Sequence, residues 1–329
     1  MQGDILMENS TNNIFTFVEE SLHKKNERDL FDTGYLKEDD FKEILDLPVK
    51  NAKVLVENRN SIIYLIIIKD GKKIVGKQSK SLSFEILNQE YNSILKMYEL
   101  NNTVFCNPMG FGLNREHNIY FLEYINFSSV AELLKSTNGI HNLQNISGLI
   151  GQGLFKIHSK LNNNMQYVDD NHQLITDVLK TPIKINRRKK NILTKAKQAL
   201  EGISFPYGLV YRDFDPLNVY VSGNTLSLID PPERFVKTYL FWDIATFSVG
   251  IKKELIRRKF VISKEVYDKV DCIIGAITNE YIQNIKSENK NKNSVKLIIL
   301  ILELQRLGEL IGNQLKHKHK NKKFSKAYL

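Results

Sequence analysis

The chain has 329 residues, of which 42% are hydrophobic and 26% are charged. These proportions are close to globular averages and exclude a fully disordered chain, collagen and a coiled-coil array. The formal net charge of +10 indicates an anionic partner: a nucleotide, a nucleic acid, a phosphorylated substrate or an acidic membrane surface. Charge alone does not choose among these classes.

Cysteine content and hydropathy indicate the compartment. Two cysteines, Cys106 and Cys272, are too few for a disulfide framework or a cysteine zinc site, and they fit a reducing environment. The N-terminus lacks a basic stretch followed by an apolar core, so no signal peptide is predicted. The longest apolar runs, Ile62–Ile68 and Val295–Leu304, are shorter than the ~20 residues of a membrane span. We expect a cytoplasmic protein.

The first part of the chain predicts a sheet with one helix. Residues 1–48 are expected to form a helical extension, and residues 49–125 a first lobe. Runs of alternating or β-branched residues predict strands in meander order at Lys53–Val56, Ser61–Lys69 and Lys73–Gln78. Asp70-Gly71 is a strong hairpin signal, and Ser83 is a start signal for the helix. The apolar segment Ile119–Ile125 predicts a buried strand that leads into the next lobe.

Residues 126–329 predict a mainly helical lobe. The apolar periodicity indicates helices at Ser129–Lys135, Asn145–Ser159, Phe241–Ile256, Lys264–Ser287 and Ser294–Leu315. Three short apolar segments interrupt them, at Gly208–Tyr211, Val219–Val221 and Thr225–Ile229. The fold class is therefore α+β, with a sheet-rich lobe followed by a helix-rich lobe.

The most informative segment is residues 208–235, which carries polar residues at the ends of predicted strands. A hairpin turning at Ser222-Gly223-Asn224 brings Asn218, at its start, beside Asp230, at its end. An amide oxygen and a carboxylate suit Mg²⁺, which leaves Asp213 to accept a proton from a hydroxyl. The alternative interpretation is that Asp213, Asp215 and Asn218 only cap a turn.

The sequence YRDFDPLN followed by LSLID resembles the catalytic and metal-binding loops of aminoglycoside phosphotransferases, choline kinases and related small-molecule kinases. These proteins have a protein-kinase-like fold. Their pattern is His-Gly-Asp-x-x-x-x-Asn, and Tyr211-Arg212 replaces the His-Gly here. The resemblance implies that Asp213 is the catalytic residue, that Asn218 and Asp230 hold the metal, and that Asp243 braces the catalytic loop from the next helix.

The resemblance also implies a nucleotide site and two cofactors, ATP and Mg²⁺. Lys77 would hold the α- and β-phosphates, and Glu90 would pair with it, with Glu85 as the competing choice. The backbone of Glu123, Tyr124 and Ile125 would contact adenine. In such kinases the histidine that corresponds to His158 is structural.

The resulting prediction is an ATP- and Mg²⁺-dependent phosphotransferase that acts on a hydroxyl of a sugar, polyol or headgroup alcohol. Basic stretches at Arg187–Lys190 and Lys252–Lys259 favour a neutral or anionic acceptor. The first alternative is a pseudokinase scaffold, because the turn at residues 57–61 lacks the glycines that cradle phosphates in protein kinases. The second is a nucleic-acid or membrane-surface binder, with the basic tail 316–326 as a weak contact for anionic surfaces.

Overall fold

A computed structural model describes residues 35–320, apart from 59, 137, 170, 181–186, 231, 233–234, 258–263 and 286–290. For residues 172, 187–190 and 313–320 it describes the backbone only. Most of the predicted extension 1–48 and the end of the basic tail 316–326 therefore lie outside the described residues. The chain divides into two compact units. One contains the residues up to Leu87 and Gly110–Tyr124, and the other contains Asn88–Met109 and the residues from Ile125 onward. The lobe boundaries 49–125 and 126–329 stay a prediction.

The first unit is built on a five-stranded antiparallel sheet with the order β1-β2-β3-β5-β4. Its elements are α2 (Glu38–Leu45), β1 (Val49–Glu57), β2 (Ser61–Ile68), β3 (Lys73–Ser79), β4 (Gly110–Asn114) and β5 (Ile119–Glu123). The predicted meander of the first three strands is confirmed. At its turns, Gly71 adopts a φ of 85°, and the Asn58 side chain accepts hydrogen bonds from the N–H groups of Asn60 and Ser61.

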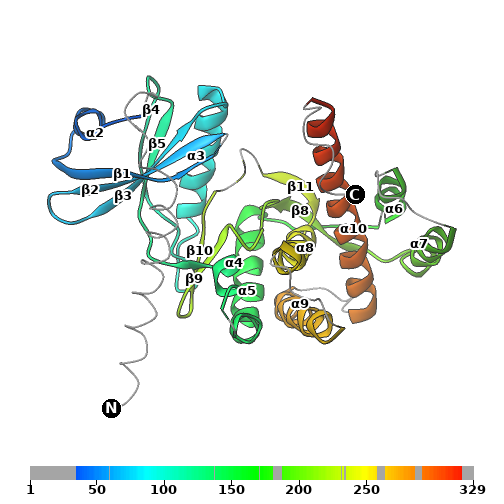
Figure 1. Cartoon of the computed structure of the whole chain (residues 1–329). Coiled ribbons are helices and arrows are strands. Elements are labelled where there is room, and N and C mark those ends of the chain that lie inside the picture. The colour runs from blue at the N-terminus through cyan, green and yellow to red at the C-terminus, as the bar shows by residue number, and fades with distance from the viewer. Residues whose placement is uncertain are drawn as a thin grey trace, which may run out of the picture. The chain divides into compact units, whose positions relative to one another are not determined.

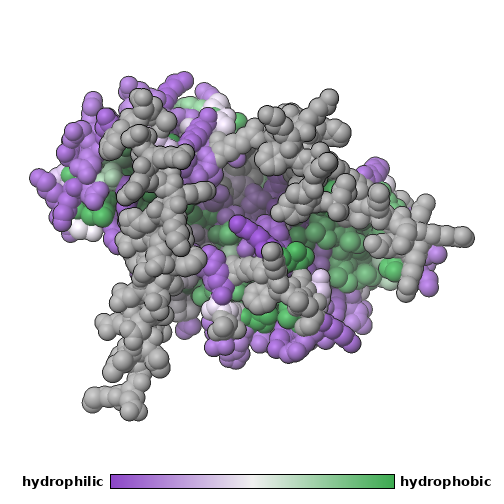
Figure 2. Space-filling model, viewed as in Figure 1, coloured by the Kyte–Doolittle hydropathy of each residue, from purple (hydrophilic) through white to green (hydrophobic). Residues whose placement is uncertain are grey.

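The core of the first unit lies between this sheet and α2. Phe41 of α2 is fully buried and packs edge to face on Tyr64, with ring centroids 5.0 Å apart. Ile66 and Ile119 from the strands complete the same cluster. Hydrophilic residues cover most of the visible surface over α2, β1 and β2 (Figure 2).

Helix α3 (Phe84–Tyr98) follows β3, as predicted, and contains the point at which the two units divide. Among its apolar residues, Leu95 and Tyr98 are exposed, whereas Leu87, Ile94 and Met97 are buried.

Helices dominate the second unit. They are α4 (Val130–Leu133), α5 (Gly139–Leu161), α6 (Asn171–Lys180), α7 (Arg187–Ala199), α8 (Trp242–Arg257), α9 (Lys264–Asn284) and α10 (Lys292–Lys320). Figure 1 shows α8 and α9 beside one another, with α5 on one side and α10 on the other. Small residues permit this packing: a Cβ on Gly151 of α5 would overlap the carbonyl oxygen of Ile277 in α9.

Two small sheets in the second unit position the candidate site. One has the order β10-β9-β6, from β10 (Thr225–Leu228), β9 (Val219–Ser222) and β6 (Ser128–Ser129). The other has the order β11-β8-β7, from β11 (Val236–Tyr239), β8 (Phe205–Val210) and β7 (Gln166–Val168). β8, β9 and β10 confirm the three predicted short strands. Among the described helices, none is long and apolar enough to cross a membrane.

Candidate active site

The loop between β8 and β9 carries Asp213 between two buried aromatic residues. Tyr211 and Phe214 are both fully buried, and their ring centroids lie 6.3 Å apart in an edge-to-face contact. Phe214 also packs against Phe247 of α8, with ring centroids 5.5 Å apart. These contacts fix the backbone on both sides of Asp213, whose own side chain is partly exposed.

Asp215 caps the turn that follows. Its carbonyl oxygen accepts a hydrogen bond from the N–H of Asn218 at 2.8 Å, and its Oδ1 accepts one from the N–H of Leu217 at 3.1 Å. The Nδ2 of Asn218 donates to the carbonyl oxygen of Asp213 at 3.0 Å. The turn-capping interpretation therefore describes Asp215, and Asn218 has its amide group oriented by the same turn.

Asp243, at the start of α8, holds this loop in place by accepting hydrogen bonds from its backbone. Its Oδ2 accepts from the N–H of Tyr211 at 2.7 Å, and its Oδ1 accepts from the N–H of Arg212 at 2.8 Å. Arg212 has a φ of 71°, so the bonds hold a left-handed conformation that non-glycine residues rarely adopt.

His158 of α5 positions the Asp243 side chain. Its Nε2 lies 2.9 Å from Oδ2 of Asp243, and its Nδ1 lies 2.7 Å from the hydroxyl of Tyr281. Both His158 and Asp243 are fully buried. The expected brace and the expected structural role of the histidine are confirmed by these contacts.

The β9–β10 hairpin brings the two predicted metal ligands to one end. Leu228 pairs with Val219, and the N–H of Ile229 donates to the carbonyl oxygen of Asn218 at 3.0 Å. Asp230 directly follows Ile229, so it lies at the same end of the hairpin as Asn218. It is exposed and has a φ of 63°.

Tyr211 connects the two loops. Its hydroxyl donates to the carbonyl oxygen of Ile229 at 3.2 Å, one residue before Asp230. Burial holds the pKa of Tyr211 well above its ordinary value, so the phenol stays a donor at neutral pH. The tyrosine that departs from the family pattern thus ties the Asp213 loop to the Asp230 loop.

Arg306 of α10 contacts Asp213. Its Nη2 lies 3.3 Å from Oδ1 of Asp213, and its Nη1 lies 3.2 Å from Oε2 of Glu309. Burial raises the pKa of Asp213 above its ordinary value, while the guanidinium groups of Arg306 and Arg212 oppose this shift. Asp213 therefore combines a raised pKa with partial access to solvent, which suits a proton acceptor.

Lys253 of α8 contacts the second loop carboxylate. Its Nζ lies 3.3 Å from Oδ2 of Asp215. Neither Arg306 nor Lys253 was predicted individually. Lys253 lies within the basic stretch Lys252–Lys259, whereas Arg306 lies 93 residues beyond Asp213 in an amphipathic helix and gives no local signal.

The oxygen atoms that Asn218 and Asp230 offer fit a magnesium ion. Because Nδ2 of Asn218 is engaged with Asp213, the amide oxygen is the atom left for a cation, and Asp230 supplies one carboxylate. Among the described residues, no group of three or more His, Cys, Asp or Glu side chains could hold a metal ion. One carboxylate and one amide oxygen match Mg²⁺, which takes its other ligands from phosphates and water.

The predicted nucleotide residues are distributed over both units. Lys77 on β3 is half-buried, with its Nζ 5.8 Å from the ring centroid of Tyr120, and it belongs to the first unit together with Glu123 and Tyr124. The N–H of Tyr124 donates to the carbonyl oxygen of Lys73. Glu90 and Ile125 belong to the second unit. The roles assigned to these residues stay predictions.

Glu90 and Glu85, the two candidate partners of Lys77, differ in burial. Its side chain is 4% exposed, whereas Glu85 is exposed on the first turn of α3. A buried carboxylate is rare unless it has a partner, so burial agrees with the choice of Glu90 over Glu85, and the pairing with Lys77 stays a prediction.

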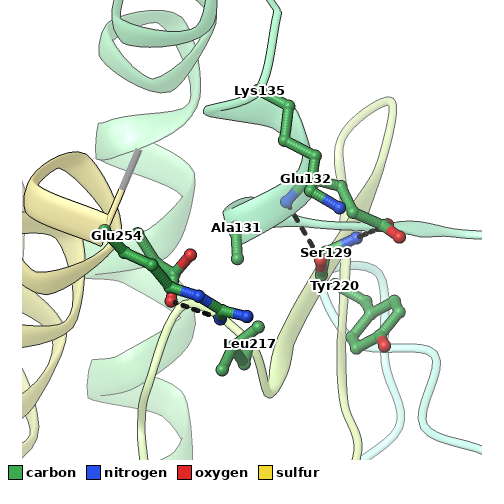
Figure 3. Close-up of a pocket in the computed structure, with 8 residues that line it drawn as sticks. Ser129, Ala131, Glu132, Lys135, Leu217, Tyr220 and Glu254 are labelled. Atoms are coloured by element: carbon green, nitrogen blue, oxygen red, sulfur yellow. Dashed lines mark hydrogen bonds and ion pairs between the residues drawn. The ribbon is translucent and has the colours of Figure 1, made fainter. Parts of the chain in front are cut away.

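A polar pocket of about 340 Å³ lies beside the Asp213 loop, within the second unit. It is lined by Ser129, Ala131, Glu132, Lys135, Leu217, Tyr220, Glu254 and Arg257. Figure 3 shows Ser129 and Glu132, which cap helix α4 reciprocally, across the pocket from Glu254. The pocket therefore offers hydroxyl groups and charges of both signs next to the turn that holds Asn218.

The fold is shared with known kinases of small molecules. No protein-family model matches the sequence, and no curated protein matches it significantly. The structure resembles a choline/ethanolamine kinase family protein from Mesorhizobium loti, at 12% identity and a TM-score of 0.50, covering 94% of this chain and 89% of that one. It also resembles the macrolide 2'-phosphotransferase MphH from Brachybacterium faecium, at 9% identity and a TM-score of 0.53, covering 85% of this chain and 94% of that one. The expected α+β fold is thereby confirmed, and the chain has the kinase-like fold of these proteins, with an antiparallel sheet unit and a mainly helical unit.

Proposed function

We propose that the chain transfers the γ-phosphoryl group of ATP to a hydroxyl group of a small molecule. The observation that carries the proposal is the arrangement around Asp213, a partly exposed carboxylate on a loop braced by Asp243 and joined to the hairpin end that holds Asn218 and Asp230. The names of the two proteins of like fold, a choline/ethanolamine kinase family protein and a macrolide 2'-phosphotransferase, support the same class of reaction.

In the proposed reaction, the bond between the γ-phosphorus and its bridging oxygen to the β-phosphate breaks. A bond forms between the γ-phosphorus and the acceptor oxygen, and ADP leaves. Asp213 accepts the proton of the acceptor hydroxyl, a contribution of about 10²–10⁴-fold to the rate. Asn218 and Asp230 would hold Mg²⁺, which when bound neutralises charge on the β- and γ-phosphates.

The remaining predicted residues complete the nucleotide site. Lys77 is proposed to hold the α- and β-phosphates, with Glu90 as its partner, and the backbone at residues 123–125 to contact adenine. The acceptor is proposed to be a sugar, polyol or headgroup alcohol. Protein groups act here mainly by positioning and by neutralising charge.

Thermal unfolding with and without Mg²⁺·ATP tests the nucleotide site. A ligand at 100 times its dissociation constant should stabilise the chain by about 2.7 kcal/mol. We expect an increase in Tm that requires both Mg²⁺ and nucleotide and that disappears in Asp230→Ala. Asp271→Ala, an exposed aspartate on α9, is the matched control and should keep the full shift. No shift in the wild type at millimolar nucleotide would contradict the proposal and favour a scaffold.

A further inference from the structure

Building on the proposed function, we propose that Arg306 and Lys253 form a subsite for an anionic group of the acceptor, and that filling it frees Asp213 for the acceptor hydroxyl. The substrate class is then a hydroxyl compound that also carries a carboxylate or phosphate. The inference rests on two ion pairs that link the catalytic loop to two C-terminal helices.

Each pair joins one loop carboxylate to one helix cation. Arg306 of α10 lies 3.3 Å from Asp213, and Lys253 of α8 lies 3.3 Å from Asp215. Because the two aspartates are two residues apart in one capped loop, both cations contact the loop that carries Asp213.

The packing behind the two cations limits their movement. A Cβ on Gly250 of α8 would overlap Pro216, so this helix lies directly against the loop. Lys252 of α8 also pairs with Glu303 of α10 at 2.9 Å, which ties the two helices together. A binding group held in advance loses less freedom when a ligand arrives.

The Arg306 side chain is itself well held, since it is only 15% exposed and its Nη1 contacts Glu309. Lys253 is more open, with 44% of its side chain exposed. A guanidinium has five N–H donors in a planar fork and can bind a second carboxylate or phosphate in place of Asp213.

The charge arrangement distinguishes the acceptor classes. Asp213 and Asp215 each already face one cation, so an amine-bearing acceptor would meet like charge at both. A neutral acceptor has no group that replaces the carboxylate on Arg306, so Oδ1 of Asp213 stays engaged. Only an anionic acceptor can exchange with Asp213 at the guanidinium and release the carboxylate for the hydroxyl proton.

The test uses the full chain with Mg²⁺·ATP and acceptors matched in carbon skeleton: glucose 6-phosphate, glucose and glucosamine, then glycerate and glycerol. ADP formation gives kcat and KM separately. In the wild type we expect a KM for the anionic members about tenfold or more below that of the neutral members, the effect of one charge-assisted hydrogen bond.

Arg306→Gln should remove this preference in a specific way. The KM of anionic acceptors should rise about tenfold or more, whereas the KM of the matched neutral acceptors should change much less. In Arg306→Lys the KM of anionic acceptors should lie between the values for the wild type and Arg306→Gln, because a lysine keeps the charge but lacks the planar fork. Lys269→Gln, on the exposed face of α9, is the control and should behave as the wild type.

Three results would overturn the inference: a preference for glucosamine, equal KM values for all classes in the wild type, or an equal loss for every acceptor in Arg306→Gln. If no acceptor is phosphorylated, the proposed function fails, and calorimetric titration of the anionic compounds then decides the subsite separately. Binding to the wild type that is lost in Arg306→Gln supports the subsite, and no binding to the wild type rejects it.

Discussion

Two aspartates of the candidate site have opposite surroundings. Asp243 is fully buried and accepts hydrogen bonds from two backbone N–H groups, so the course of the loop depends on its carboxylate oxygens. Asp213 is partly exposed, and burial is the largest influence on its pKa, which it raises. The charge of Asp213 is therefore opposed by its environment. Replacing each residue by asparagine should affect different properties of the protein.

Asp213→Asn should lower kcat strongly without lowering stability. Because the native pKa lies above the unfolded one, the contribution of Asp213 to the unfolding free energy falls as pH rises through these two values and stays low at neutral pH. Removing the charge removes this unfavourable contribution. We expect a Tm at pH 7 equal to or above the wild type and a loss of kcat of about 10²-fold or more.

Asp243→Asn is the counterpart to that variant. It leaves at least one buried N–H group or His158 without its acceptor, so the unfolding free energy should fall by about 2 kcal/mol or more. A pair of denaturation curves compares the two variants directly. A larger loss of stability in Asp213→Asn than in Asp243→Asn would contradict the roles assigned to them.

The raised pKa of Asp213 also predicts the pH dependence of catalysis. A general base acts only when deprotonated, so kcat should fall on acidification, and the midpoint should lie above the ~4 of an ordinary aspartate. The profile of kcat between pH 4 and 8, at saturating acceptor, measures this midpoint. An acid limb at or below the ordinary value would show that Asp213 is not the titrating base.

At the scale of elements, two of the glycines of helix α5, Gly148 and Gly151, have different surroundings. A Cβ on Gly151 would overlap the carbonyl oxygen of Ile277 in α9, whereas nothing lies within 4 Å of one on Gly148. Gly151→Ala should therefore destabilise the protein by about 1–3 kcal/mol through overpacking. Gly148→Ala should stabilise it by about 0.5–1 kcal/mol, because alanine favours the helix.

The same pair provides its own control. The two substitutions are chemically identical and lie in one helix, so chemical denaturation of both separates packing from helix propensity. If Gly151→Ala were also stabilising, α5 and α9 would not pack as closely as the structure shows.

Local sequence signals explain which elements could be predicted. The β9–β10 hairpin has turn residues between short apolar runs, so the hairpin and the meeting of Asn218 with the end of β10 followed from the sequence. The predicted three-residue turn is shorter in the structure, because Ser222 pairs with Thr225 and leaves only Gly223 and Asn224 in the loop. The buried face of α3 does not follow from hydropathy alone, because Glu90 is buried while Leu95 is exposed. Tertiary packing overrides apolar periodicity there.

The candidate site was predictable where it is built from neighbours in sequence. Asp213, Asn218 and Asp230 lie within one short segment, and a family resemblance extended the prediction to Asp243. The contact of Arg306 with Asp213 depends on how α10 packs against α8, a long-range arrangement that no local pattern encodes.

At the scale of the molecule, the two units have separate buried clusters. One is centred on Phe41, Tyr64 and Ile66 of the sheet unit, and the other includes Ile157, Phe214 and Phe247 of the helical unit. Separate cores allow one unit to lose stability without an equal loss in the other.

Phe41→Ala tests this independence. Removing a fully buried phenylalanine should cost the sheet unit about 3–5 kcal/mol. We expect hydrogen exchange to become faster in β1, β2 and β3, while α5 and α9 keep their protection. An equal loss of protection in all of these elements would mean that the two units unfold as one.

Arg212 has the left-handed backbone conformation at the position that corresponds to the glycine of the His-Gly-Asp-x-x-x-x-Asn pattern. The hydrogen bond that the N–H of Arg212 donates to Oδ1 of Asp243 holds that conformation without help from a glycine. Every arginine codon becomes a glycine codon by a single change at its first base, and here the exchange would leave the backbone path unaltered. Lineages can therefore move between the two residues without passing through a misfolded intermediate. A sequence signature that demands glycine at this place will pass over chains whose loop has the same course.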